Sequence, residues 1–217
     1  MMKKLKAVIF DLDGTIANTL PLCISSFRNS IEPLAGRAVS DAEIIATFGP
    51  SEEGTIMALA PGHYDKGVSE YLRIYEENHS MCPAPFDGMP QILASLKQKG
   101  IRVAMVTGKG RASAVITLDK FGVAHFFEML EAGHIHGNRK ADGIEAILGA
   151  WSGVGKDEVV YVGDTASDIL TCREAGIAIV SAAWAETAEP EQLLPLKPDH
   201  IFYTVPEFAE WLETHTI

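Results

Sequence analysis

The sequence predicts an α/β fold, in which a three-layer core with a parallel sheet carries a small all-α domain. Two observations indicate this architecture. Short apolar segments alternate with amphipathic helical segments over most of the chain, and one stretch near the N-terminus interrupts that alternation. At 217 residues, the chain is long enough for one such core and one accessory domain.

Five segments have the apolar, β-branched character of strands that are buried in a parallel sheet. They cover residues 7–10, 102–106, 159–162, 177–180 and 200–203. Helical patterns alternate with these strands at residues 90–99, 111–121, 141–150, 167–175 and 206–214. Because crossovers between parallel strands place helices against the sheet, this order predicts a helical layer on both faces.

Residues 17–84 contain helical segments and no convincing strand, so we expect them to form a separate helical domain. Residues 1–16 and 85–217 then form the core. Within the helical stretch, residues 40–43 have the spacing of a helix-capping box. Apolar side chains within residues 68–75 recur at the spacing of one helix face, which indicates an amphipathic helix.

The composition is that of a folded globular protein, with 47% apolar and 22% charged residues. A formal net charge of −11 disfavours binding to a polyanion, so we expect a small-molecule partner and no nucleic acid. The first apolar run ends at Asp11, too early for a signal peptide, and no segment has membrane-spanning length. Three widely spaced cysteines indicate neither disulfides nor a zinc site, so a cytoplasmic protein is expected; the oligomeric state is not predicted.

Two carboxylates follow the first predicted strand, in the segment DLDGT. In extended backbone, side chains two positions apart point to the same side, so Asp11 and Asp13 are expected to converge. At the carboxyl edge of a sheet, where α/β proteins bind ligands, two carboxylates repel each other unless a cation or a proton lies between them. Gly14 allows a sharp turn, and the Thr15 hydroxyl can hold the loop by bonding to nearby backbone.

An acidic turn without chemistry and a calcium-binding loop are the alternatives for DLDGT. Aspartate and glycine are common in turns, so the pattern alone does not exclude the first alternative. The calcium loop is excluded, because the positions that require Asp or Asn, Gly and Glu hold Thr15, Ile16 and Leu22.

Three later segments supply the other groups that phosphoryl transfer needs. In VTGK, Thr107 and the backbone N–H groups that follow it can hold phosphate oxygens. Lys140, in GNRKADG, can neutralise negative charge, and Asp164 and Asp168 of GDTASD can hold a hard metal ion. Alone, each segment has an ordinary explanation as a strand-end hydroxyl, a solvated lysine or an acidic helix cap. Their joint order along the chain is the informative signal.

The order DLDGT, VTGK, a lone Lys140 and GDTASD resembles the four motifs of the haloacid dehalogenase superfamily, over nearly the whole chain. A helical insert between the first two motifs is similar to the branch that includes phosphoglycolate phosphatases and β-phosphoglucomutases. The resemblance implies a Rossmann-like core, a helical cap domain and Mg²⁺ as cofactor. That branch often has Lys-Pro in its third motif, whereas Ala141 follows Lys140 here, so Arg139 and Lys109 are the alternative cations.

The resemblance also implies a role for each matching residue. Asp11 would be the nucleophile and a metal ligand, and Asp13 the general acid and base, with its backbone carbonyl on the metal. Thr107 would bind the transferred phosphoryl group, Lys140 would neutralise charge, and Asp164 would complete the metal ligands. Substrate binding is expected from Gly14, Thr107, Gly108, Lys109 and Lys140, and support of the site from Thr15 and Asp168.

These residues favour a phosphatase that hydrolyses a small phosphate ester through an aspartyl-phosphate. Asp13 distinguishes it from a dehalogenase, because an alcohol leaving group needs an acid to protonate it. A phosphosugar mutase of the β-phosphoglucomutase kind and a noncatalytic module that binds a phosphorylated ligand are the alternatives; the segment VTGK favours the hydrolase over the mutase. Within the helical insert, substrate contacts are expected from Arg28, Gly49, Pro50, Ser51 and Arg73.

Overall fold

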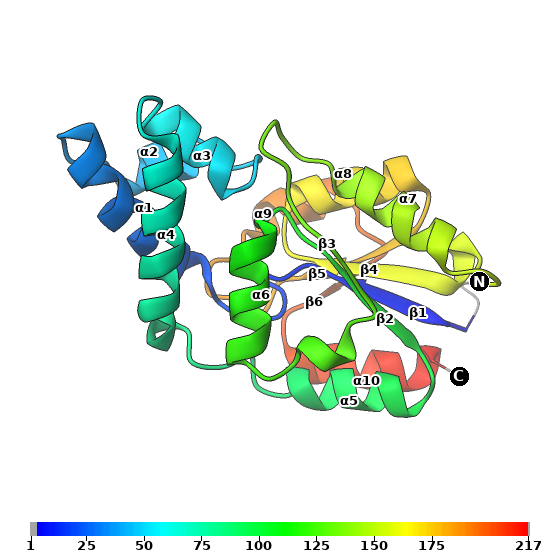
Figure 1. Ribbon diagram of the computed structural model, residues 1–217. Helices are drawn as coiled ribbons and strands as arrows, with labels where there is room; N and C mark the ends of the chain where they lie inside the picture. Colours follow the sequence, from blue (N-terminus) through cyan, green and yellow to red (C-terminus); the bar gives the residue numbers. More distant parts are fainter. Residues whose placement is uncertain (1–3, 217) are drawn as a thin grey trace.

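A parallel β-sheet forms the core of the structure, a computed structural model that describes residues 4–216. Figure 1 shows its strands: β1 (Ala7–Phe10), β2 (Arg102–Val106), β3 (Met129–Glu131), β4 (Val159–Gly163), β5 (Ala178–Ala182) and β6 (His200–Phe202). Their order across the sheet is β3-β2-β1-β4-β5-β6, and all neighbours are parallel. The order reverses between β1 and β4, and ligands of open α/β sheets bind at such a point.

Helices cover both faces of the sheet (Figure 1). One layer contains α5 (Met89–Gln98), α6 (Arg111–Lys120) and α10 (Val205–His215), and the other contains α7 (Lys140–Ala150), α8 (Ala166–Ala175) and α9 (Pro190–Leu193). Alternate residues of a strand face opposite sides, so Val8 packs with the first layer and Ile9 with the second. The 3₁₀ turns are η1 (His79–Met81), η2 (Ala124–Phe126), η3 (Lys156–Glu158) and η4 (Leu194–Leu196). Within residues 4–216, no helix is both long and apolar enough to cross a membrane.

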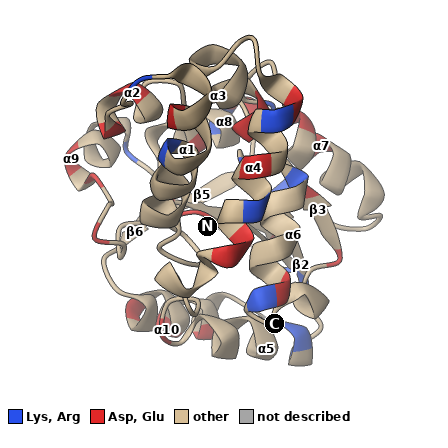
Figure 2. Ribbon diagram, turned by 60° about the vertical axis from the view of Figure 1, so that its left-hand side comes forward, with Lys and Arg blue, Asp and Glu red and all other residues tan. Residues whose placement is uncertain are grey.

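Between β1 and β2 the chain forms a separate group of helices, which we call the insert (residues 20–81). It contains α1 (Leu20–Ala35), α2 (Asp41–Ile45), α3 (Glu52–Leu59), α4 (Tyr64–Glu77) and the turn η1. The insert has its own apolar core, in which the ring of Tyr71 lies 4.4 Å from that of Phe27 and 5.7 Å from that of Tyr75. Acidic and basic positions alternate along α4, on the side away from this core (Figure 2).

The insert is joined to the core by side-chain contacts with α6 and by two chain connections. The hydroxyls of Tyr75 and Thr117 lie 2.8 Å apart, and Nε2 of His79 lies 3.3 Å from the same threonine hydroxyl. The two connections run side by side, since the N–H of Phe86 donates to the carbonyl of Ile16 at 2.9 Å. The insert lies beyond the carboxyl ends of the strands (Figure 1).

The predicted α/β class is confirmed, and the expected strands and core helices are present with small shifts at their ends. One strand, β3, was not predicted. It has three half-buried residues, one of them Glu131, and pairs on one side only, with β2. A short edge strand of this kind has no run of buried apolar residues to reveal it. In the insert, the capping box of Ser40 and Glu43 is formed, whereas the boundaries of the helical domain at residues 17 and 84 stay a prediction.

The aromatic cluster between α10 and the sheet allows the packing of the core to be tested. Phe208 is fully buried, with the rings of Phe10, Trp184 and Trp211 around it. We expect Phe208→Ala to lower the free energy of unfolding by about 3–5 kcal/mol, because it removes apolar contacts and leaves a cavity. Urea unfolding followed by circular dichroism measures this change.

The matched control truncates an apolar residue in solvent. Leu170 is 55% exposed on α8, and Leu170→Ala should change the free energy of unfolding by no more than about 0.5 kcal/mol. Equal effects of the two truncations would contradict the packing described for Phe208.

Candidate active site

The loop after β1 carries two carboxylates to the carboxyl edge of the sheet. Asp11 is buried, and the side chain of Asp13 is 31% exposed and accepts a hydrogen bond from the hydroxyl of Thr19. Gly14 follows with a φ of +73°, and a Cβ at this position would overlap the carboxylate of Asp164. Glycine is therefore required both for the turn and for the close approach of Asp164.

The segment after β4 brings two more carboxylates to the same edge. Asp168 lies in the first turn of α8, where it accepts hydrogen bonds from the N–H and hydroxyl of Thr165 at 3.0 and 2.7 Å. The hydroxyl of Tyr161 donates to the other oxygen of Asp168 at 3.2 Å. Asp164 precedes the helix and faces the β1 loop, so carboxylate oxygens of Asp11, Asp164 and Asp168 all lie within 4.8 Å of one another.

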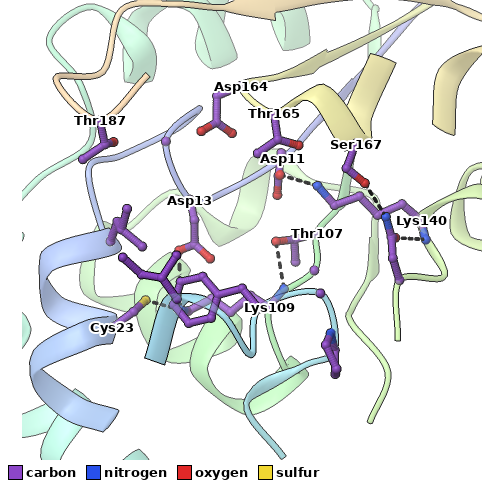
Figure 3. Close-up of a pocket in the computed structure, with 18 of the residues that line it drawn as sticks. Asp11, Asp13, Cys23, Thr107, Lys109, Lys140, Asp164, Thr165, Ser167 and Thr187 are labelled. Carbon is purple, nitrogen blue, oxygen red and sulfur yellow. Dashed lines mark hydrogen bonds and ion pairs between the residues drawn. The ribbon is translucent and has the colours of Figure 1, made fainter. Parts of the chain in front are cut away.

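Lys140 lies among these carboxylates. It is the first residue of α7, and its Nζ donates to Oδ2 of Asp11 at 2.5 Å (Figure 3). The same Nζ donates to Oδ1 of Asp168 at 2.6 Å. The side chain of Asn138 accepts a hydrogen bond from the backbone N–H of Lys140 at 2.9 Å, which fixes the start of the helix. The lysine is buried, and its ammonium contacts both carboxylates at the pocket.

Burial dominates the ionisation of this cluster. It raises the pKa of Asp11 to about 6, with Lys140 acting in the opposite direction and Asp168 adding repulsion. Burial also raises the pKa of Asp164 well above its ordinary value, and repulsion by Asp11 and Asp168 adds to the effect. For Asp168, burial is outweighed by the ion pair with Lys140 and by the hydrogen bonds from Thr165, and its pKa is lowered. Lys140 thus balances only part of the negative charge.

The donors at this edge fit a hard divalent cation. They are carboxylate oxygens, which Mg²⁺ prefers. Asp168 is occupied by Lys140, Thr165 and Tyr161, whereas no ion pair within residues 4–216 involves Asp164. The carboxylate of Asp164 lies directly against the backbone of Gly14, in the β1 loop. The residues with capacity to hold Mg²⁺ are therefore Asp11 and Asp164, together with the backbone of the β1 loop.

The turn after β2 brings a buried hydroxyl to the cluster. Thr107 is 2% exposed, and its Oγ1 accepts a hydrogen bond from the N–H of Lys109 at 3.2 Å. The turn is held from behind, because the N–H of Gly133 donates to the carbonyl of Lys109 at 2.7 Å. A Cβ on Gly133 would overlap the carbonyl oxygen of Gly108. The segment after β3 therefore fixes the position of Thr107.

A second buried ion cluster lies beside this turn and includes Lys109. The Nζ of Lys109 lies 3.4 Å from Oδ1 of Asp13, 3.4 Å from Oε1 of Glu52 and 3.1 Å from Sγ of Cys23. Its side chain is 1% exposed, and the ring of Tyr75 lies 4.4 Å from the ammonium. Figure 3 shows Lys109 and Lys140 reaching the carboxylates from different sides.

Glu52 connects the insert to the core through this cluster. It begins α3, is buried, and accepts hydrogen bonds from the N–H of Gly110 and the hydroxyl of Ser113 at the start of α6. The hydroxyl of Tyr71 donates to it at 3.4 Å. A carboxylate is favourable at a helix N-terminus, where backbone N–H groups lack partners within the helix.

One pocket with a volume of about 460 Å³ lies between the insert and the core, beside these groups. The core side holds the catalytic candidates, and the insert side is mostly apolar. The insert contributes Leu20, Cys23, Phe27, Ile45, Phe48, Gly49, Pro50, Glu52, Thr55 and Tyr71.

Comparison with known proteins agrees with this arrangement. The family model described as haloacid dehalogenase-like hydrolase matches residues 8–182. The chain belongs to this family. A pyrophosphatase PpaX from Bacillus pumilus is 32% identical to it over 90% of both chains.

Two solved structures share the fold of this haloacid dehalogenase-like hydrolase, insert included. A family member from Streptococcus pneumoniae has 24% identity and a TM-score of 0.76, over 95% of this chain and 98% of that one. A predicted phosphoglycolate phosphatase from Haemophilus somnus has 21% identity and a TM-score of 0.75, over 99% of both chains. The sequence-based expectation of a phosphatase of this family is confirmed.

The motif residues of this hydrolase lie at the pocket or directly behind it. Thr15 and Asp168 are fully buried and bond to Asp164 and Lys140. Lys140, and not Arg139, reaches Asp11, since Arg139 pairs with a surface aspartate. The residues that line the pocket are Asp11, Asp13, Gly14, Thr107, Gly108, Lys109, Lys140 and Asp164.

The insert residues expected to contact substrate are only partly at the pocket. Gly49 and Pro50 line it. Arg28 instead forms an ion pair with Asp41, and Arg73 pairs with two glutamates along α4. Ser51 is buried at the start of α3, where its N–H donates to a backbone carbonyl.

Sequence reasoning missed Glu52 and Gly133. An acidic residue in the first turn of a helix is ordinary, and its own helix gave no sign that Glu52 also occupies the N-terminus of α6. Gly133 follows the strand that was not predicted, so its approach to Gly108 had no basis in the sequence pattern.

The contact between Gly133 and Gly108 can be tested by adding one methyl group. We expect Gly133→Ala to lower kcat for phosphate release by about 100-fold, because it displaces the turn that carries Thr107. Gly149→Ala is the control, since a Cβ there meets nothing within 4 Å. Steady-state kinetics and thermal unfolding measure both variants. Normal kcat in a folded Gly133→Ala protein would show that the turn tolerates the shift.

Proposed function

We propose that this phosphatase hydrolyses small phosphate monoesters through an aspartyl-phosphate on Asp11, with Mg²⁺ as cofactor. The observation that carries the proposal is the ion pair of Asp11 with Lys140 at the floor of a pocket whose opposite wall belongs to the insert. In this proposal residues 17–84 form a cap domain, and residues 1–16 and 85–217 form the catalytic core.

Asp11 is the proposed nucleophile. The N–H of Leu12 donates to its Oδ1 at 2.6 Å, and Lys140 holds its Oδ2, so the carboxylate is fixed in one orientation. Attack by a carboxylate oxygen forms a bond to phosphorus and expels the alkoxide of the leaving group. When bound by Asp11, Asp164 and the carbonyl of Asp13, Mg²⁺ would offset the repulsion between the nucleophile and the phosphate dianion.

Asp13 is the proposed general acid and base. It lies at the more open side of the cluster, two residues after the nucleophile, and is held by Thr19 and Lys109. As an acid, it gives its proton to the departing alkoxide. As a carboxylate, it then takes a proton from the water that attacks the aspartyl-phosphate, which releases phosphate and restores Asp11.

The remaining motif residues hold the phosphoryl group or the site itself. The hydroxyl of Thr107 and the backbone of Gly108 and Gly14 lie at the pocket and are the proposed contacts of the phosphoryl oxygens. Lys140 balances their charge, with Asp168 holding the ammonium in place.

Pyrophosphate is the second candidate substrate, because the chain is similar to the pyrophosphatase PpaX of Bacillus pumilus. The carboxylate of Asp11 would attack one phosphorus atom of pyrophosphate in the same way, with inorganic phosphate as the leaving group. A mutase would transfer the phosphoryl group to a second hydroxyl instead of water, and phosphorus NMR of the products separates this outcome from hydrolysis.

The nucleophile can be tested with a panel of phosphate monoesters. Protein with Mg²⁺ should release phosphate, and EDTA should stop the release until Mg²⁺ is restored. Asp11→Asn should lower the rate at least about 1,000-fold, because it removes the attacking oxygen. Asp142→Asn, at a surface ion pair, is the control. Equal rates in Asp11→Asn and the unaltered protein would refute the proposed nucleophile.

The role of Asp13 can be tested by changing the leaving group. Asp13→Asn should slow hydrolysis of an alkyl phosphate by about 10²–10⁴-fold, because the alkoxide is no longer protonated. With 4-nitrophenyl phosphate, whose leaving group needs no acid, we expect one rapid equivalent of nitrophenol and then slow turnover, since water lacks a base. Rapid-quench kinetics measure both. Equal losses with the two esters and no burst would contradict this role.

A further inference from the structure

We propose that the leaving group of the substrate is uncharged and partly apolar, so that esters with a carboxylate or a second phosphate are poor substrates. This inference rests on the proposed function, because it concerns the group attached to the transferred phosphate. It follows from the charges and the apolar side chains of the pocket.

The ammonium groups of the pocket are already paired. Lys140 lies between the carboxylates of Asp11 and Asp168, at 2.5 and 2.6 Å. Lys109 lies between those of Asp13 and Glu52, at 3.4 Å from each, and its side chain is 1% exposed. Within residues 4–216 these are the two lysines that line the pocket, and no arginine lines it. An anionic leaving group would therefore find no cation without a carboxylate partner.

Carboxylates also occupy two of the helix N-termini beside the pocket, those of α6 and α8. Glu52 accepts the N–H of Gly110 at the start of α6. Asp168 accepts the N–H of Thr165 at the start of α8. A helix N-terminus attracts anions through its unpaired N–H groups, and a carboxylate already there weakens that attraction.

Acidic side chains outnumber basic ones in the pocket lining. Five carboxylates line the pocket, against two ammonium groups. The carboxylates belong to Asp11, Asp13, Glu52, Asp164 and Glu189. The phosphoryl group of the substrate brings further negative charge, which Lys140 and Mg²⁺ would balance. A second anionic group would add repulsion with no compensating contact.

The insert presents apolar side chains to the part of the pocket that the leaving group would occupy. Ile45 is 46% exposed and Phe48 is 39% exposed, and both line the pocket together with Leu20 and Phe27. Exposed apolar side chains that line a concave site gain free energy when an apolar ligand covers them. On the core side, Asn138 and Thr187 offer neutral hydrogen-bonding groups.

The substrate preference proposed for this chain differs from the compounds that appear in the names of its relatives. The leaving group of pyrophosphate is inorganic phosphate, and that of phosphoglycolate is an alcohol that carries a carboxylate. Both leaving groups are therefore anionic. The carboxylate of Glu52 lines the pocket and would repel such a leaving group. We therefore expect neither compound to be the preferred substrate.

Matched pairs of esters test the proposal. Phenyl phosphate is compared with 4-carboxyphenyl phosphate, and ethyl phosphate with phosphoglycolate, with pyrophosphate as a further anionic compound. We expect kcat/KM to be at least about tenfold higher for the neutral member of each pair. Equal or better hydrolysis of the anionic members would overturn the inference and leave the proposed function intact. No release from any ester would overturn both.

The charge of Glu52 is tested by a substitution that keeps its shape. Glu52→Gln removes one of the two carboxylates that balance the positive charge of Lys109. The ratio of kcat/KM for the neutral ester to kcat/KM for the anionic ester should therefore fall about fivefold. The ratio does not depend on the fraction of protein that is folded, because both esters are assayed with the same protein sample. Glu53→Gln is the control, since Glu53 does not line the pocket, and should leave the ratio unchanged. An unchanged or higher ratio in Glu52→Gln would overturn the inference.

Discussion

The repulsion among carboxylates buried at one edge of the sheet is the constraint on which the rest of the structure depends. β1 and β4 are neighbours at the centre of the sheet, so the loops that follow them bring Asp11, Asp164 and Asp168 to one place. Burial is the main cause of the raised pKa values of Asp11 and Asp164, and repulsion by the neighbouring carboxylates adds to it. Lys140 stabilises the arrangement by bridging two of the three.

Several local features serve this arrangement. Gly14 has no side chain where Asp164 approaches, and Gly133 has none where the Thr107 turn approaches. Asp168 also closes the capping box of α8, so the residue that holds the lysine is itself held by the helix start. The carboxylates of Asp11 and Asp168 are each held by a backbone N–H as well as by Lys140.

The sequence predicted which motif residues meet at this edge of the sheet, because the information that places them is local. Each motif combines a strand end with the turn that follows it, and parallel strands place all such ends at one edge. What it did not predict depends on contacts between distant elements. β3 is too short and too polar to show a buried-strand pattern, and Glu52 meets α6 only after the insert has folded. Arg28 and Arg73 were expected to contact substrate, but Arg28 pairs with Asp41 and Arg73 pairs with Glu70.

The division of the pocket between two walls has a consequence for how such a protein diverges. The groups proposed to handle phosphorus come from the sheet edge, while Leu20, Phe27, Ile45 and Phe48 come from the insert. The insert packs around its own core, so its lining side chains can be exchanged without disturbing the strands. Mutations confined to this part of the chain can therefore give a gene duplicate a new substrate while it inherits the old chemistry.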